Sequence, residues 1–130
     1  FTLPDSDVRL GNSVFYSSGI STLTFGKNTV IKATGIGVFE KVASLTVDVS
    51  LSNYYKADQN AVYTKDGASL IFLVPKSSVV TFTVPASVRH IEDGAFSANP
   101  YIISVDFATG SALESIGYAS FACNRKHRRT

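Results

Sequence analysis

The sequence has no methionine and no tryptophan, and it has only one cysteine and two histidines. A single cysteine, Cys123, excludes an intrachain disulfide, so cysteine usage leaves the redox compartment open. His90 and His127 are too few for a histidine-based metal site without help from carboxylates, and no carboxylate motif accompanies them. We therefore expect no metal ion and no other cofactor.

Long apolar runs are also missing. The longest, residues 70–74, is far shorter than the ~20 residues that a membrane-spanning helix needs, and we expect no signal peptide within this sequence. The chain opens with Phe1 inside a strand-like pattern. We expect a processed or excised piece of a longer protein, with no membrane insertion.

Charge is sparse, because 17% of the residues are charged and 45% are hydrophobic. Four of the twelve Lys and Arg lie within residues 125–130, so the body of the chain has eight basic against ten acidic residues. This balance gives no electrostatic footprint for nucleic acid. We expect residues 125–130 to form a disordered basic tail on a single domain, residues 1–124.

What the sequence does have is an internal repeat of about 25 residues. Val88 and Leu113 are 25 apart, as are Ile91 and Ile116, and Phe15 and Phe39 are 24 apart. Each unit begins with alternating apolar and small polar residues, which predicts a strand with one buried face. The strand starts are Leu23, Leu45, Phe82 and Val105.

One such unit cannot bury its own apolar face, so the units must stack. The predicted fold is a β-rich α/β-type solenoid of about five repeats, with one parallel sheet and irregular return arms containing turns or short helical segments. The third unit is longer than its neighbours, and residues 65–67 (Lys-Asp-Gly) separate two β-rich runs. Asp-Gly between such runs favours a tight hairpin turn, which predicts a β-hairpin inserted within residues 53–75.

Residues 84–99, VPASVRHIEDGAFSAN, and residues 113–124, LESIGYASFACN, resemble the unit of the BspA-type leucine-rich repeats of microbial surface proteins. The segment from 53 (NYY) through 63–67 (YTKDG) to 74–75 (VP) is similar to a variant unit of that family. The first unit is one residue short between Val8 and Phe15, and residues 32–37 are irregular. The family resemblance implies a right-handed solenoid that is secreted or exposed on a cell surface.

The resemblance also implies adhesion to, or interaction with, proteins or glycans on another cell or matrix, without catalysis. Two alternatives stay open, a structural spacer and an accessory module of a larger secreted enzyme. No nucleophile-elbow motif or phosphate-binding glycine loop is present to indicate catalysis. Exposed ends of such a stack predict end-to-end self-association.

Candidate binding residues follow from the strand alternation, since the neighbours of inward residues must point outward. Two predicted ladders of outward side chains make a polar platform: Thr22, Ser44, Thr81 and Ser104, and Thr24, Thr46, Thr83 and Asp106. Cross-strand packing alone also accounts for such ladders.

Three tyrosines near the insert are the other candidate anchors, namely Tyr54, Tyr55 and Tyr63, although some of them are expected to pack the hairpin down. Structural roles are assigned to the repeat-spaced rings and amides. The rings, which are expected in the core, are Phe15, Phe39, Phe96 and Phe121. The amides, expected to bond turn backbone, are Asn99 and Asn124. Cys123 is expected to act as a small buried hydrophobe.

Overall fold

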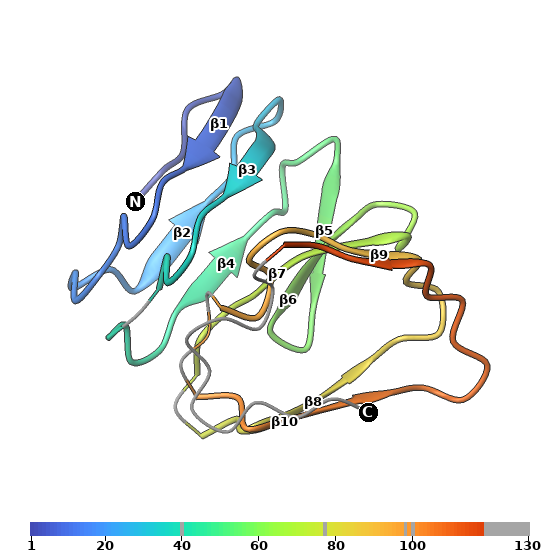
Figure 1. The fold of residues 1–130 in the computed structure, drawn as a ribbon. Helices are drawn as coiled ribbons and strands as arrows, with labels where there is room; N and C mark the ends of the chain where they lie inside the picture. Colours follow the sequence, from blue (N-terminus) through green and yellow to red (C-terminus); the bar gives the residue numbers. More distant parts are fainter. Residues whose placement is uncertain (40, 77, 98, 100, 119–130) are drawn as a thin grey trace.

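The computed structural model describes residues 1–118 except 40, 77, 98 and 100. These residues wind into a β-solenoid of about five turns (Figure 1). They form strands and no helix, so the α/β component of the expected fold is not found in this part of the chain. The strands are β1 (Asp7–Leu10), β2 (Thr22–Thr24), β3 (Val30–Thr34), β4 (Thr46–Asp48), β5 (Tyr55–Asp58), β6 (Ala61–Thr64), β7 (Ser69–Leu73), β8 (Thr81–Val84), β9 (His90–Ile91), β10 (Ser104–Phe107) and β11 (Ser115–Ile116).

Each regular turn of the solenoid contributes two short strands instead of one. The first strand of each unit pairs in parallel with its equivalent, β2 with β4 and β8 with β10. The arms expected to be irregular also contain parallel strands, because β1 pairs with β3 and β9 with β11. Val and Ile recur in these arms, and β-branched residues favour the extended backbone that such pairing needs.

The single parallel sheet that the sequence predicts is divided in the structure. The pairs β2–β4 and β8–β10 belong to separate sheets. Between them the chain forms an antiparallel meander, in which β5 pairs with β6 and β6 with β7 (Figure 1). The third unit thus contains the antiparallel strands β5, β6 and β7 in place of a regular turn of the solenoid. These strands interrupt the parallel pairing between β4 and β8.

The meander turns at two places where the backbone is left-handed. Gln59 and Asn60 join β5 to β6 with φ of 48° and 72°, and Gly67 has φ of 76° between β6 and β7. Two consecutive residues with positive φ form the tight turn whose twist matches that of the flanking strands. Beyond β7, the five-stranded sheet continues in parallel through β9 to β11.

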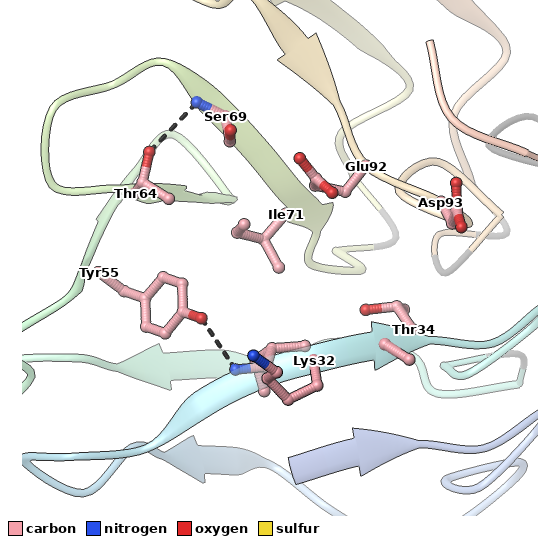
Figure 2. A pocket seen from close by; sticks show the side chains of 10 residues that line it. Lys32, Thr34, Tyr55, Thr64, Ser69, Ile71, Glu92 and Asp93 are labelled. Carbon is pink, nitrogen blue, oxygen red and sulfur yellow. Dashed lines mark hydrogen bonds between the residues drawn. The ribbon is translucent and has the colours of Figure 1, made fainter. Parts of the chain in front are cut away.

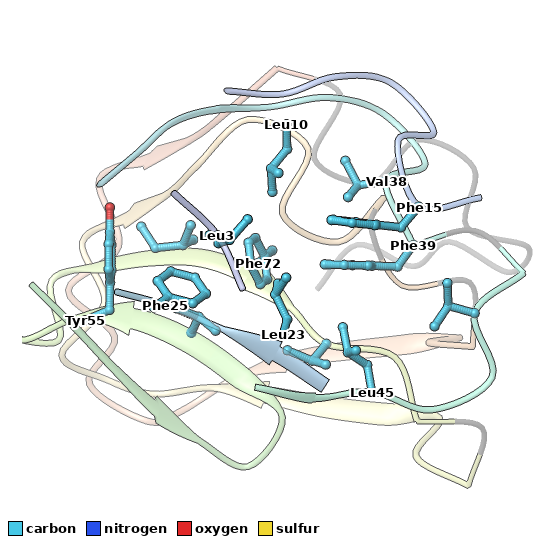
Figure 3. Close-up of a cluster of buried hydrophobic side chains, with 14 residues drawn as sticks. Leu3, Leu10, Phe15, Leu23, Phe25, Val38, Phe39, Leu45, Tyr55 and Phe72 are labelled. Atoms are coloured by element: carbon cyan, nitrogen blue, oxygen red, sulfur yellow. The ribbon is translucent and has the colours of Figure 1, made fainter. Parts of the chain in front are cut away.

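Aromatic rings connect successive turns of the solenoid through the core (Figure 3). The rings of Phe15 and Phe39 are stacked, with centroids 5.7 Å apart and planes 5° apart. Phe39 in turn meets the edge of Phe72 at 5.3 Å, so β7 of the meander continues the aromatic column. Phe96 is fully buried in the second half of the molecule and packs against Phe82.

The buried residues form two clusters, and the meander supplies side chains to both. Val62 and Phe72 belong to the N-terminal cluster with Leu23 and Phe39. Tyr63 and Leu70 belong to the C-terminal cluster, together with Val84 and Phe96. Since neighbouring side chains of a strand point to opposite faces, one meander can close two cores at once.

The bends that follow β1, β3, β9 and β11 are stacked on one another from turn to turn of the solenoid. The side chain of Asn12 accepts a hydrogen bond from the N–H of Ile36 (2.8 Å), and Asp93 accepts one from Tyr118 (2.7 Å). Gly94 has φ of 69°, and a Cβ there would lie 2.7 Å from the carbonyl oxygen of Gly35. Only glycine fits this corner without displacing its neighbour.

The predictions for Phe121, Cys123, Asn124, His127 and the tail 125–130 lie outside the described residues. Of the residues that are described, none belongs to a helix long and apolar enough to cross a membrane.

Candidate functional site

The predicted ladders of Thr and Ser are correct in the second half of the chain and out of register in the first. Ser104 lies opposite Thr81, and Asp106 opposite Thr83, as their 23-residue spacing predicts. Thr22, however, lies opposite Thr46, where the prediction had placed Ser44. The partner of Thr24 is Asp48, not Thr46.

This two-residue error has a physical cause at the entry to β4. The prediction paired Leu23 with Leu45, but Leu23 lies opposite Val47, which agrees with the 24-residue offset of the stacked rings of Phe15 and Phe39. Leu45 is held by the chain that leaves the meander, because its N–H donates to the carbonyl of Pro75 (3.0 Å). Ser44 makes an antiparallel bridge with Lys76.

The ladders do not form one continuous platform, because the β5–β6 turn lies between β4 and β8. Gln59 and Asn60 line a hollow of about 220 Å³ beside Thr46, and also one of about 350 Å³ beside Thr81 and Thr83. The exposed hydroxyls therefore remain in two separate short patches. Neither patch carries a large aromatic side chain that could act as an anchor.

The three tyrosines have different environments. Tyr63 is 3% exposed and packs in the C-terminal core, where burial raises its pKa to about 12. Tyr55 is 4% exposed, and its ring meets Phe25 edge to face at 5.4 Å. Tyr54 is 47% exposed, so it is the only one of the three with a ring accessible to a ligand.

A cleft of about 250 Å³ opens between β3 and the meander, and we call it the β3–β7 cleft (Figure 2). Strand β3 pairs with β1 along one edge only, so its other edge faces the cleft. There the hydroxyl of Tyr55 accepts a hydrogen bond from the N–H of Ile31 (2.8 Å). The cleft is lined by Ile31, Lys32, Ala33, Thr34, Tyr55, Thr64, Ser69, Ile71, Glu92 and Asp93.

A backbone irregularity places Lys32 at this cleft. In the β1–β3 pair, Val8 lies opposite Ile31 and Arg9 opposite Ala33, so Lys32 is an extra residue of β3. Such a bulge redirects a side chain and often occurs beside a functional site. Lys32 is exposed and makes no ion pair within the described part of the chain.

The walls of the cleft are polar and its floor is apolar. The carboxylate of Glu92 and the hydroxyls of Thr34 and Ser69 make no side-chain hydrogen bond within the residues described, while Ile71 forms the buried floor. The pKa of Tyr55 is raised above its ordinary value, mainly by burial and further by the charges of Glu92 and Asp7. Its hydroxyl is therefore neutral at physiological pH.

A second, wider hollow of about 590 Å³ adjoins the cleft, and we call it the Tyr54 hollow. Lys32, Tyr55 and Thr64 line both spaces, so the two lie side by side. The remaining lining residues of the Tyr54 hollow are Asp7, Val30, Asn53, Tyr54, Lys65 and Asp66. Asp66 is fixed by hydrogen bonds from the N–H of Ala68 and the hydroxyl of Thr64, and these lower its pKa.

Sequence reasoning identified the tyrosines of this region but missed Lys32, Thr34, Ser69 and Glu92. The one available signal was the irregularity of residues 32–37, which departs from the repeat pattern. It could not show which later segment faces it, because Glu92 reaches the same cleft from a different coil.

The described residues offer little for catalysis. No group of three or more His, Cys, Asp or Glu within this part of the chain could hold a metal ion. Nδ1 of His90 lies 2.8 Å from the hydroxyl of Ser115, but neither residue lines any of the four hollows described above. This pair stabilises the contact between β9 and β11.

The family model for the BspA type leucine rich repeat region matches residues 1–73 and 75–129, in six copies. The chain therefore belongs to the BspA-type leucine-rich-repeat family. Proteins of this family are commonly secreted or surface exposed, and repeat solenoids of this kind are typically non-catalytic modules for interaction. No curated protein and no solved structure matches the chain.

Proposed function

We propose that this chain is a non-catalytic interaction module of a secreted or surface protein, which adheres to a ligand on another cell or matrix. The observation that carries this proposal is the depression formed by the adjoining β3–β7 cleft and Tyr54 hollow. It combines one accessible aromatic ring with charged and hydroxyl side chains that have no partner in the described structure. Binding sites are commonly built in this way on a rigid scaffold.

The Thr and Ser patches are a weaker candidate surface. The β5–β6 turn separates them, and its residues Gln59 and Asn60 line a hollow beside each patch. Small hydroxyls on a strand surface bury little area and lack the aromatic or arginine anchors that dominate binding energy. The depression around Tyr54 has such an anchor, so we place the contact surface there.

The proposal is tested by measuring binding of the full chain to a panel of matrix proteins and glycans. The variant Tyr54→Ala removes the ring from the depression, and the variant Thr46→Lys, Thr83→Lys blocks the two patches. We expect saturable binding that Tyr54→Ala weakens and the double variant retains.

Loss of binding in the double variant alone would move the contact surface to the patches. The absence of saturable binding to every member of the panel would contradict the proposal and favour a structural spacer or an accessory module of a larger enzyme.

A further inference from the structure

We infer that the β3–β7 cleft and the Tyr54 hollow together bind a neutral oligosaccharide. This inference deepens the proposed function and rests on it, because it names the class of ligand for the same depression. Four features of the depression favour this ligand, namely its shape, the chemistry of its walls, its charge, and the state of the strand edges that border it.

The shape suits a chain of several linked units better than one small molecule. The two spaces measure about 250 and 590 Å³ and share the side chains of Lys32, Tyr55 and Thr64. A chain of linked units can thus place one unit at the exposed Tyr54 ring and another beside Glu92 and Asp93 in the adjoining cleft.

The walls present both donors and acceptors that are not already used. Around the cleft, the ammonium of Lys32 lies on the β3 side, and the hydroxyl of Ser69 and the carboxylate of Glu92 lie on the opposite side (Figure 2). A sugar hydroxyl both donates and accepts hydrogen bonds, so it can bond a carboxylate and an ammonium at the same time.

The depression also has the apolar surfaces that a sugar ring needs. The ring of Tyr54 is half exposed and makes no contact with another aromatic ring of the described structure, so its face is open to a ligand. Ile71 gives the cleft an apolar floor. The C–H groups on one face of a pyranose can pack against such surfaces while its hydroxyls face the walls.

An extended peptide fits this site poorly. Addition of a peptide strand needs an open edge with unpaired N–H and C=O groups. At the edge of β3 the N–H of Ile31 is already bonded to the hydroxyl of Tyr55 (2.8 Å). Across the cleft, β7 has β6 on one side and β9 on the other, so it has no free edge.

The charge of the cleft disfavours an acidic sugar. Two carboxylates, those of Glu92 and Asp93, line the cleft against the single ammonium of Lys32. The Tyr54 hollow adds Asp7, Asp66 and Lys65, so the two spaces together have four carboxylates and two ammonium groups. Uronic or sulfated units would meet like charges over much of the site, whereas neutral units would not.

The experiment is a binding measurement of the full chain on an array of neutral, acidic and sulfated oligosaccharides, with matrix proteins on the same array. Affinities of the bound oligosaccharides are then measured by calorimetry for the wild type and three variants. Tyr54→Ala and Glu92→Ala remove one contact each. The matched control is Tyr16→Ala, because Tyr16 is similarly exposed, at 50%, and lines none of the hollows.

We expect the wild type to bind neutral oligosaccharides. Tyr54→Ala and Glu92→Ala should each lower the affinity about tenfold or more, and tenfold corresponds to about 1.4 kcal/mol. Tyr16→Ala should leave the affinity unchanged. Binding only to acidic or sulfated members would overturn the inference. Tyr54-dependent binding only to proteins would also overturn it while leaving the proposed function intact. No binding to any member would contradict both.

Discussion

At the scale of single residues, the corner at Gly94 shows how closely the coils are stacked. Its φ is 69°, and a Cβ would lie 2.7 Å from the oxygen of Gly35. Gly110 has a comparable φ of 79° but open space around it. Both glycines therefore need a left-handed backbone, but only at Gly94 would a side chain collide with a neighbouring turn.

We predict that Gly94→Ala destabilises the fold considerably more than Gly110→Ala does. Both variants place a side chain on a left-handed backbone, at a cost of about 1–2 kcal/mol, but only the first forces two backbones apart, which adds about 1–3 kcal/mol. Urea denaturation of both variants measures the difference. Equal free energies of unfolding would show that the corner has room to relax.

Tyr63 provides a residue-scale prediction on pH. Its pKa is raised from 10.0 to about 12 in the folded chain by burial, so the folded state holds this proton more tightly than the unfolded state. This stabilisation is fully present below pH 10 and is lost as the pH rises from 10 to 12, by up to about 1.4 kcal/mol per pH unit for one proton.

The measurement is the free energy of unfolding as a function of pH, in the wild type and in Tyr63→Phe. We expect a shallower decline between pH 10 and 12 in the variant, because it lacks that titrating group. Identical slopes would mean that Tyr63 ionises as easily in the folded chain as in the unfolded one.

At the scale of elements, the junction of β3 with the meander depends on one side-chain hydrogen bond. The hydroxyl of Tyr55 is the acceptor for the N–H of Ile31 at an edge that no strand covers. Tyr55 thereby fixes the width of the cleft, because its ring is also packed against Phe25.

We predict that Tyr55→Phe lowers the free energy of unfolding by about 1 kcal/mol, because it leaves the partly buried Ile31 N–H without its acceptor. Tyr54→Phe is the matched control, since the hydroxyl of Tyr54 makes no hydrogen bond in the described structure, and its effect should stay within about 0.5 kcal/mol. Thermal or urea unfolding compares the two. A neutral Tyr55→Phe would show that water replaces the hydroxyl at this edge.

At the scale of the whole molecule, the meander joins two cores into one cooperative unit. Val62 and Phe72 face the N-terminal cluster, and Tyr63 and Leu70 face the C-terminal one. A repeat protein can unfold in parts when adjacent units interact weakly. Here strands β6 and β7 supply buried residues to both clusters, so separate unfolding would expose buried residues of each.

We predict a single unfolding transition, with coincident midpoints by far-UV circular dichroism and tyrosine fluorescence. Phe72→Ala should lower the free energy of unfolding by about 3–5 kcal/mol. The midpoint should fall accordingly, and by the same amount in both signals. Two separated midpoints in the wild type would show that the halves are energetically independent.

The repeat pattern was sufficient to predict stacking and inward-facing strand residues, because these depend on local alternation and on apolar residues that recur every 24 or 25 positions. The family was predicted from the resemblance of residues 84–99 and 113–124 to its repeat unit. Leu23 and Val105 are buried, and Phe15 stacks on Phe39. A strand that can bury only one face has few other ways to fold. The sequence by itself therefore determined the solenoid.

Only the tertiary structure decided the register of β4, the division of the parallel sheet and the position of the cleft. These features follow from how the meander packs, which moves Val47 opposite Leu23 and closes the edge of β3 with Tyr55. Lys32 and Glu92 meet because different coils are stacked there. Long-range pairing of this kind is set by the summed packing of the whole core, and no local pattern of residues encodes it.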